Sequence, residues 1–289
     1  MSLKPRSVTS SLDVFVPLRP KKMLNYFQEI YRRVADYLVT QGEHDTGIIQ
    51  VNPKGDQTKA FDYNTEEMIL NYFEKQLPFP VQVLTEERGE ISLGSGSPHY
   101  TIIIDPVDGS NNFMRGLGMT GFSVAAIPAG EPLSIYHVQY GFVGHIYLDK
   151  VFTCEKGKGA FCNGEALYTS QQRELHRSCL SIYAVGPNAE DLACNVPLLK
   201  AVTDIRNFGT AAYEICQVAA GGLDGFIDIR GPLTPENFMA AAPMVLEAGG
   251  VITDERGEAL APVEKLENGC KFIASGNRTL HDAILKTLS

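Results

Sequence analysis

The sequence predicts a protein of mixed α and β structure, of the α+β and α/β classes, built in two lobes. The first half opens with amphipathic helical segments and continues in short strand-like runs, whereas strand and helix patterns alternate from about residue 178. A chain of 289 residues with 44% hydrophobic content lies near the upper size for a single core. We therefore divide it into a leader (1–20), an α+β lobe (21–177) and an α/β lobe (178–289).

Two helices and a strand begin the first lobe. In Lys21–Gln41 and again in Thr65–Gln76, apolar residues recur three and four positions apart, the spacing of an amphipathic helix. Pro78 ends the second of these helices, because proline cannot continue the hydrogen-bond ladder. Ile48–Val51 between them predicts a short strand, followed by a turn at Pro53–Thr58.

Further strands complete the first lobe. Val81–Thr85 and Tyr100–Ile104 are rich in β-branched residues, and the second is a continuous apolar run of the kind found where both faces of a strand are covered. Thr120–Ile127, Ser134–Tyr140 and His145–Thr153 follow as the strands of an antiparallel meander. The predicted sheet is therefore mixed or antiparallel.

The second lobe is predicted from alternating strand and helix patterns. Its segments are, in chain order, Cys179–Tyr183, Leu192–Val202, Thr210–Ala220, Phe226–Ile229, Pro235–Ala248, Val251–Thr253, Phe272–Ala274 and Leu280–Leu288.

Charge and cysteine usage exclude several classes of function. The formal charge of -9 repels nucleic acid and anionic membrane surfaces. The six cysteines lack the spacing of a zinc site and are expected to be free thiols. No secretory signal is visible, and the longest charge-free run, Pro132–Leu148, alternates like strands. We expect a cytoplasmic protein that binds neither membranes nor nucleic acid.

The most informative stretch follows the strand at Tyr100–Ile104. Asp105 and Asp108 stand three residues apart on a segment that Pro106 stiffens, and we expect it to be a turn on which both carboxylates and the Val107 carbonyl converge. Hard oxygen ligands gathered in this way suit Mg²⁺.

Glycine and hydroxyl residues follow these carboxylates. Gly109 lets the backbone approach a ligand without a Cβ atom, and Ser110 can open a helix whose N–H groups face an anion. Taken alone, a hexapeptide such as Asp105–Ser110 is more often an ordinary turn. Glu86, 19 residues before Asp105, ends another apolar strand, however, so a further carboxylate is expected at the same sheet edge.

Together with other segments, this stretch resembles the inositol monophosphatase family, within the lithium-sensitive, magnesium-dependent phosphatases that include fructose-1,6-bisphosphatase. The resemblance runs from about Met23 to the C-terminus and implies a layered αβαβα sandwich of the sugar-phosphatase type. The remaining segments are Thr58–Asp62, Gly157–Gly164, Phe208–Ala212, Gly221–Asp224 and Glu247–Gly250.

The resemblance also implies a cluster of two or three Mg²⁺ ions, with Mn²⁺ as an alternative. It assigns Glu86, Asp105 and the Val107 carbonyl to the first ion, and Asp105 with Asp108 to the second. Asp62 matches an additional acidic position that serves a third ion or its water shell. The residues alone leave open that Asp62 is instead the N-cap of the helix that follows it.

Catalytic and substrate contacts are implied in the same way. Ser110 and Glu86 would orient the attacking water, and Asp108, Gly109 and Ser110 would contact the phosphate. In the second lobe, the resemblance implies substrate contacts at Gly209, Thr210, Ala211, Asp228 and Arg206. For Arg206 an ordinary surface ion pair remains the alternative.

One position departs from the family pattern. Twelve residues before Gly249 the family carries an aspartate, and this chain carries Asn237. Asparagine keeps an oxygen ligand but removes a negative charge, which weakens the second metal site. Glu236 is rotated by about 100° on a helix and replaces the missing charge only if the helix start at Pro235 is shifted by one residue.

The expected function is Mg²⁺-dependent hydrolysis of a phosphate monoester, inositol monophosphate or fructose 1,6-bisphosphate, by a metal-activated water. The resemblance further implies a homodimer. Two alternatives stay open: a 3'(2'),5'-bisphosphate nucleotidase, and a weakened family member with a regulatory role because of Asn237.

Overall fold

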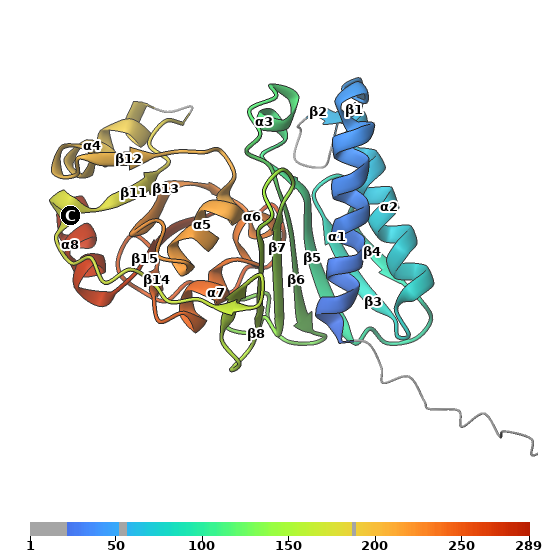
Figure 1. Cartoon of the computed structure of the whole chain (residues 1–289). Helices are drawn as coiled ribbons and strands as arrows, with labels where there is room; N and C mark the ends of the chain where they lie inside the picture. Colours follow the sequence, from blue (N-terminus) through green and yellow to red (C-terminus); the bar gives the residue numbers. More distant parts are fainter. Residues whose placement is uncertain (1–21, 52–56, 187–188) are drawn as a thin grey trace, which may run out of the picture.

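The structure is a computed structural model that describes residues 22–51, 57–186 and 189–289. The predicted leader and most of the predicted turn at 53–58 lie outside the described residues. The described elements stack in five layers, in the order helices, sheet, helices, sheet, helices (Figure 1). This confirms the predicted αβαβα sandwich.

The first sheet has eight strands in the order β10-β9-β8-β7-β6-β5-β3-β4, and α1 (Met23–Thr40) and α2 (Ala60–Gln76) cover one of its faces. β3 and β5 are parallel and the other neighbours are antiparallel, so the sheet is mixed as predicted. The strands are β3 (Val81–Thr85), β4 (Gly89–Leu93), β5 (Tyr100–Asp108), β6 (Gly121–Pro128), β7 (Tyr140–His145), β8 (Val151–Glu155), β9 (Ala160–Cys162) and β10 (Glu165–Ala166). A separate hairpin pairs β1 (Ile48–Val51) with β2 (Gln57–Lys59), and two 3-10 turns occupy Gly42–His44 and Leu175–Arg177.

The second sheet has five strands in the order β12-β11-β13-β15-β14. Helices α4 and α8 pack on its outer face, and α5, α6 and α7 fill the space between the two sheets (Figure 1). The bounds are β11 (Cys179–Ile182), α4 (Ala189–Ala201), β12 (Asp204–Arg206), α5 (Ala211–Ala219), β13 (Gly225–Leu233), α6 (Pro235–Phe238), α7 (Ala242–Glu247), β14 (Val251–Thr253), β15 (Cys270–Ser275) and α8 (Arg278–Leu288).

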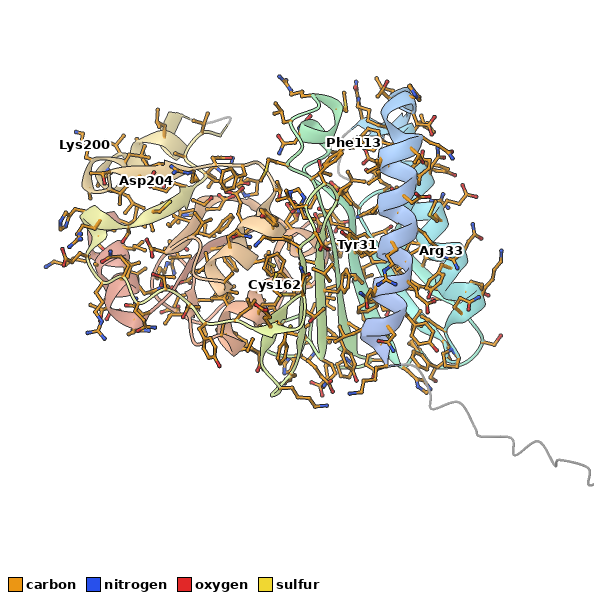
Figure 2. All side chains as sticks on the ribbon, viewed as in Figure 1. Tyr31, Arg33, Phe113, Cys162, Lys200 and Asp204 are labelled. Carbon is orange, nitrogen blue, oxygen red and sulfur yellow. The ribbon has the colours of Figure 1, made fainter. Side chains whose placement is uncertain are left out.

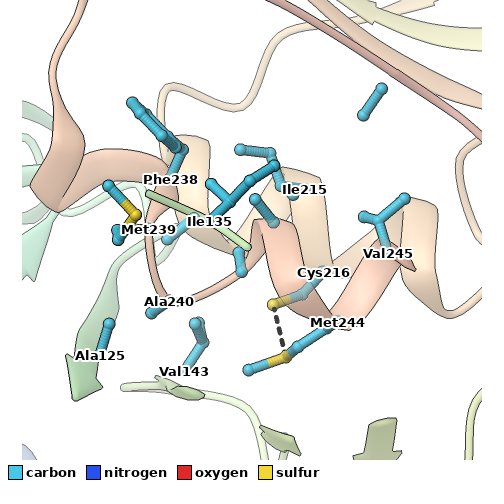
Figure 3. Packing of buried hydrophobic residues seen from close by; sticks show 14 of the residues in the cluster. Ala125, Ile135, Val143, Ile215, Cys216, Phe238, Met239, Ala240, Met244 and Val245 are labelled. Carbon is cyan, nitrogen blue, oxygen red and sulfur yellow. Dashed lines mark hydrogen bonds between the residues drawn. The ribbon is translucent and has the colours of Figure 1, made fainter. Parts of the chain in front are cut away.

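A single apolar cluster joins the first sheet to the middle helices. Ala125 and Val143 of the sheet lie in the same buried cluster as Ile215 and Cys216 of α5 and Met244 of α7 (Figure 3). The Cys216 thiol lies 3.7 Å from the Met244 sulfur. Phe226 and Phe272 of the second sheet belong to the same cluster. The middle helices therefore pack closely against both sheets.

Two strands of the predicted meander were wrong. Most of Ser134–Tyr140 forms turns and His145–Thr153 crosses a turn, whereas the strands lie at β7 and β8. The predicted strand Ser134–Tyr140 stops before Gly141, yet Gly141 lies inside β7.

Glycine in β7 serves close packing. A Cβ atom at Gly141 would lie 2.4 Å from the carbonyl oxygen of Ala240 in the middle layer. On the same strand, a Cβ atom at Gly144 would lie 2.3 Å from the ring of Tyr31 on α1. These residues let the layers on both sides approach the sheet backbone, which explains glycine within a strand.

Helix boundaries also moved. α2 begins at Ala60, five residues before the predicted Thr65, and the predicted helix Pro235–Ala248 is two short helices, α6 and α7. Pro243 explains the break, since it has no N–H to bond the carbonyl four residues earlier and its ring crowds that carbonyl. In the described part of the chain, no helix combines the length and apolar character needed to cross a bilayer.

Candidate metal and phosphate site

Two adjoining hollows open where β5 ends, beside α3 (Ser110–Met114) and the loops of the second lobe. Their volumes are about 460 and 230 Å³. Of the residues predicted for the site, those that line one or both hollows are Asp62, Glu86, Asp105, Val107, Asp108, Gly109, Ser110, Gly209, Ala211, Asp228 and Asn237. Thr210 and Arg206 line neither.

A β-bulge places the two aspartates of β5 on one face of the sheet. Asp105 pairs with Ser123 of β6, and Asp108 pairs with Gly121, so three steps on β5 match two steps on β6. In a regular strand, residues three apart point to opposite faces, and the extra residue of a bulge reverses this. The expected turn after Ile104 was therefore wrong, because Asp105 and Asp108 converge through a bulge within the strand.

The N-terminus of α5 holds Asp108. The Tyr213 amide donates to Asp108 Oδ2 at 3.3 Å, and the Ala212 amide also hydrogen-bonds to this carboxylate. Burial raises the pKa of Asp108 to about 7, although these hydrogen bonds lower it. Thr210, whose backbone was predicted to contact substrate, is the N-cap of α5, and its side chain is fully buried.

Glu66 fixes the end of β3, and sequence reasoning missed it. Its carboxylate accepts hydrogen bonds from Thr85 Oγ1 at 2.8 Å and from the Glu87 amide at 3.2 Å. Glu86, between these two residues, lines both hollows. The available signal was spacing, because Glu66 follows Asp62 by four residues and shares its helix face.

Asp62 lies in the first turn of α2. The N-cap of that helix is Lys59, so the N-cap interpretation of Asp62 is wrong. Burial, followed by the charges of Glu87 and Glu86, raises the pKa of Asp62 to about 8. The carboxylate lines the larger hollow, as the metal interpretation expects.

Like charges crowd the floor of the site. The pKa of Asp105 lies well above its usual range because of burial and the neighbouring charges of Glu86, Asp108 and Glu236. Within the described residues, no group of three acidic, histidine or cysteine side chains is already arranged as a metal-binding cluster. A set of oxygen donors with excess negative charge nevertheless fits a hard divalent cation.

The raised pKa values of the buried carboxyl groups predict how the stability of the protein depends on pH. Asp62 and Asp108 have folded-state pKa values above their unfolded values, so the metal-free protein binds more protons when folded. Its stability should therefore fall as pH rises from about 4 to about 8. Melting curves in EDTA and in Mg²⁺ test this: the increase in Tm on adding Mg²⁺ should be larger at the upper end of this range. An equal increase at both ends would contradict it.

Arg230 is the basic residue that lines the smaller hollow, and Lys59 lines the larger one. Arg206 lies on the edge strand β12, where it pairs with Asp204, and Asp204 lies at the far side of the second lobe (Figure 2). Arg230 lines the smaller hollow and binds both carboxylate oxygens of Asp228, at 2.9 and 2.7 Å. Arg206, for which a substrate contact was predicted, lines neither hollow and forms the surface ion pair that was left open as its alternative.

Asn112 ties the two halves of the chain together at the site. Its side-chain amide donates to the carbonyls of Met119 at 2.9 Å and Gly209 at 3.3 Å, and also to that of Phe208. Gly209 lines the smaller hollow. Asn112 therefore sets the position of a second-lobe loop relative to α3, a role that the sequence pattern did not reveal.

Asn237 reaches the site and Glu236 lies behind it. Asn237 lines the smaller hollow with Asp105 and Asp108, whereas Glu236 is 1% exposed and lines neither hollow. α6 begins at Pro235, so the helix start is not shifted by one residue. The residue at the family's aspartate position is thus the one that faces the hollow.

A five-layer αβαβα sandwich with an acidic hollow at a strand end defines a metal-dependent phosphatase of the sugar-phosphatase class. The profile of the inositol monophosphatase family matches residues 23–289. The chain therefore belongs to the inositol monophosphatase family, whose members are phosphoric monoester hydrolases that depend on a divalent metal.

Individual relatives agree with this assignment. The chain is 32% identical to a fructose-1,6-bisphosphatase/inositol-1-monophosphatase of Methanothermobacter thermautotrophicus, covering 86% of this chain and 89% of that protein. A protein of the same description from Thermococcus kodakarensis is 31% identical, with 92% and 95% covered. A crystal structure described as an inositol monophosphatase-fructose 1,6 bisphosphatase matches with a TM-score of 0.78 at 25% identity, covering 92% of this chain and all of that one.

Proposed function

We propose that the chain hydrolyses a sugar or inositol phosphate monoester in a Mg²⁺-dependent reaction, with inositol 1-phosphate and fructose 1,6-bisphosphate as substrates. The observation that carries this proposal is the convergence of Glu86, Asp105 and Asp108, from two strands, on adjoining oxygen-lined hollows. The descriptions of the archaeal relatives support the choice of these two substrates.

The proposed metal ligands are Glu86, Asp105, the Val107 carbonyl, Asp108 and Asn237, with Asp62 serving a third ion. Bound Mg²⁺ would supply positive charge that lowers the pKa of water and neutralises the phosphate and the leaving alkoxide. Two or three ions are proposed, with Mn²⁺ able to replace Mg²⁺.

The remaining residues bind and orient. Glu86 and Ser110 position the attacking water, and the Gly109 and Ser110 amides, with Asp108, contact the phosphate. Gly209 and Ala211 contact the substrate's hydroxyl-bearing part, and the Asp228–Arg230 pair forms the far wall.

This proposal divides the work between the lobes. Residues 21–177 supply most of the metal ligands, and residues 178–289 supply Asn237 and the loops that contact substrate. We further propose a cytoplasmic homodimer. Light scattering coupled to gel filtration tests the dimer.

Phosphate release tests the function. With inositol 1-phosphate or fructose 1,6-bisphosphate, the chain should release phosphate as Mg²⁺ is added, and EDTA should stop the reaction. Adenosine 3',5'-bisphosphate is the comparison substrate for nucleotidase activity. Absence of phosphate release from both sugar substrates at every Mg²⁺ concentration would contradict the proposal.

Arg230 and Arg206 form a matched pair for a second prediction. Arg230→Gln removes the bidentate partner of buried Asp228 and should raise KM by about tenfold or more. Arg206→Gln removes an exposed pair and should leave KM and Tm unchanged. Steady-state kinetics and melting curves check both, and equal effects of the two variants would contradict the assignment of Arg230 to the site.

A further inference from the structure

Glu236 and Asn237 form a linked pair beside the candidate metal site. The Asn237 Nδ2 atom lies 3.3 Å from Glu236 Oε1, and the same oxygen accepts a hydrogen bond from the Thr234 hydroxyl. The Glu236 main-chain carbonyl accepts from Ser123 Oγ at 3.0 Å, which fixes the start of α6 against β6. The start of α6, which carries both residues, is thus anchored to Ser123 of β6, the residue that pairs with Asp105.

The contact decides which end of the Asn237 amide faces Glu236. A carboxylate only accepts hydrogen bonds, so it must face Nδ2, and an oxygen in that place would be repelled. The carbonyl end, Oδ1, is then the end left for the hollow that Asn237 lines. Oxygen is the atom that a hard cation requires.

Glu236 also brings charge to the site. Its side chain is buried, and its charge is among those that raise the pKa of Asp105. The aspartate of the family motif combines a ligand oxygen and a negative charge in one residue. Here Asn237 provides the oxygen, and Glu236, one residue earlier, provides the charge.

We propose that Glu236 is a positioning residue that turns the Asn237 carboxamide with Oδ1 toward the metal cluster and supplies the negative charge that Asn237 lacks. The inference rests on the proposed function for its choice of cation. In this arrangement Asn237 provides the ligand oxygen and Glu236 provides the negative charge, so an aspartate at position 237 is not needed.

Metal titration without substrate tests the pair. Isothermal titration calorimetry with Mn²⁺ compares the wild type with Glu236→Gln, Asn237→Asp and the double variant. Glu236→Gln should weaken Mn²⁺ binding by about 10- to 100-fold, because its amide no longer fixes the orientation of Asn237 and the charge is lost. Asn237→Asp should give no tighter binding, since a second carboxylate then faces Glu236.

The double variant separates positioning from a merely structural role. It restores one carboxylate and one amide in exchanged places, so Mn²⁺ affinity should return to near the wild-type value. Glu247→Gln is the matched control. Glu247 lies at the end of the neighbouring helix α7 and accepts hydrogen bonds from the Gly157 and Gly159 amides, between β8 and β9. This variant should leave Mn²⁺ affinity unchanged. Melting curves in EDTA report whether each variant is folded.

The outcomes are distinct from those of the activity assay. Wild-type Mn²⁺ affinity in Glu236→Gln would overturn the inference, as would tighter binding in Asn237→Asp alone. The expected pattern of Mn²⁺ affinities in a chain that releases no phosphate would support the role of Glu236 while the proposed function fails. In an active chain, the Mg²⁺ concentration for half-maximal rate should follow the same order as the Mn²⁺ affinities.

Discussion

Asp105→Asn should reduce phosphate release by roughly 10³-fold or more while making the metal-free protein more stable. Asp105 lines both hollows and is the only proposed ligand of two ions, so the amide loses charge where the reaction needs it most. Without metal, the same carboxylate is buried among Glu86, Asp108 and Glu236. Removing that repulsion should raise the Tm of the metal-free protein at pH 8, where the wild-type carboxylate costs most.

Asp105→Asn is expected to lower activity and to raise the Tm of the metal-free protein, and this combination identifies a residue of the site. A residue needed only for folding would lower both activity and Tm. Asp204→Asn is the matched control, because Asp204 is on an edge strand, forms an exposed pair with Arg206 and lines neither hollow. It should change neither quantity. Activity of Asp105→Asn within tenfold of wild type, at saturating Mg²⁺, would contradict the proposed site.

Gly109→Ala should be the most damaging small substitution at the site. Gly109 has φ +88°, and a Cβ atom there would lie 2.9 Å from the Met119 carbonyl and 3.0 Å from the Gly209 carbonyl. Backbone strain and this clash together should cost about 2–4 kcal/mol. Because Gly209 belongs to the second lobe, the clash also separates the two walls of the smaller hollow. Urea unfolding and kinetics measure both effects.

Gly116 separates strain from contact. It also has positive φ, +64°, but an added Cβ atom would meet nothing within 4 Å. Gly116→Ala should therefore cost only the strain, about 1–2 kcal/mol, with little loss of activity. If the two variants lose equal stability and equal activity, the close approach of Gly109 to Gly209 is not what the site requires.

The pattern of β5 was interpreted correctly for its chemistry and incorrectly for its geometry. Asp105 and Asp108 were expected to meet because Pro106 favours a turn, yet they meet through a bulge whose partner residues lie on β6. Local sequence cannot specify a bulge, because the extra residue is defined only against the neighbouring strand. The predictions for Ser134–Tyr140 and His145–Thr153 were wrong for a related reason. Gly141 and Gly144 lie within a strand because the neighbouring layers pack closely on them.

Residues joined across the site were the hardest to foresee. Arg230, Asn112 and Glu66 each contact a distant segment, Arg230 through the Val185 carbonyl, and none belongs to a local motif that names a role. Arg206 was predicted from the family resemblance, and Arg230 was not considered. In space it sits on an edge strand, since β12 pairs only with β11.

The sequence by itself determined the mixed α and β class through its hydrophobic spacing, and the family with its layered architecture through the order of its motifs. It also predicted the oxygen ligands of the proposed site. Only the tertiary structure decided which groups share the hollow. Asn237 faces it and Glu236 stands behind, Arg230 replaces Arg206, and α5 holds Asp108. The contact of α5 with Asp108 joins segments far apart in sequence, and which of the neighbours Glu236 and Asn237 faces the hollow depends on how two sheets pack on one shared layer of helices.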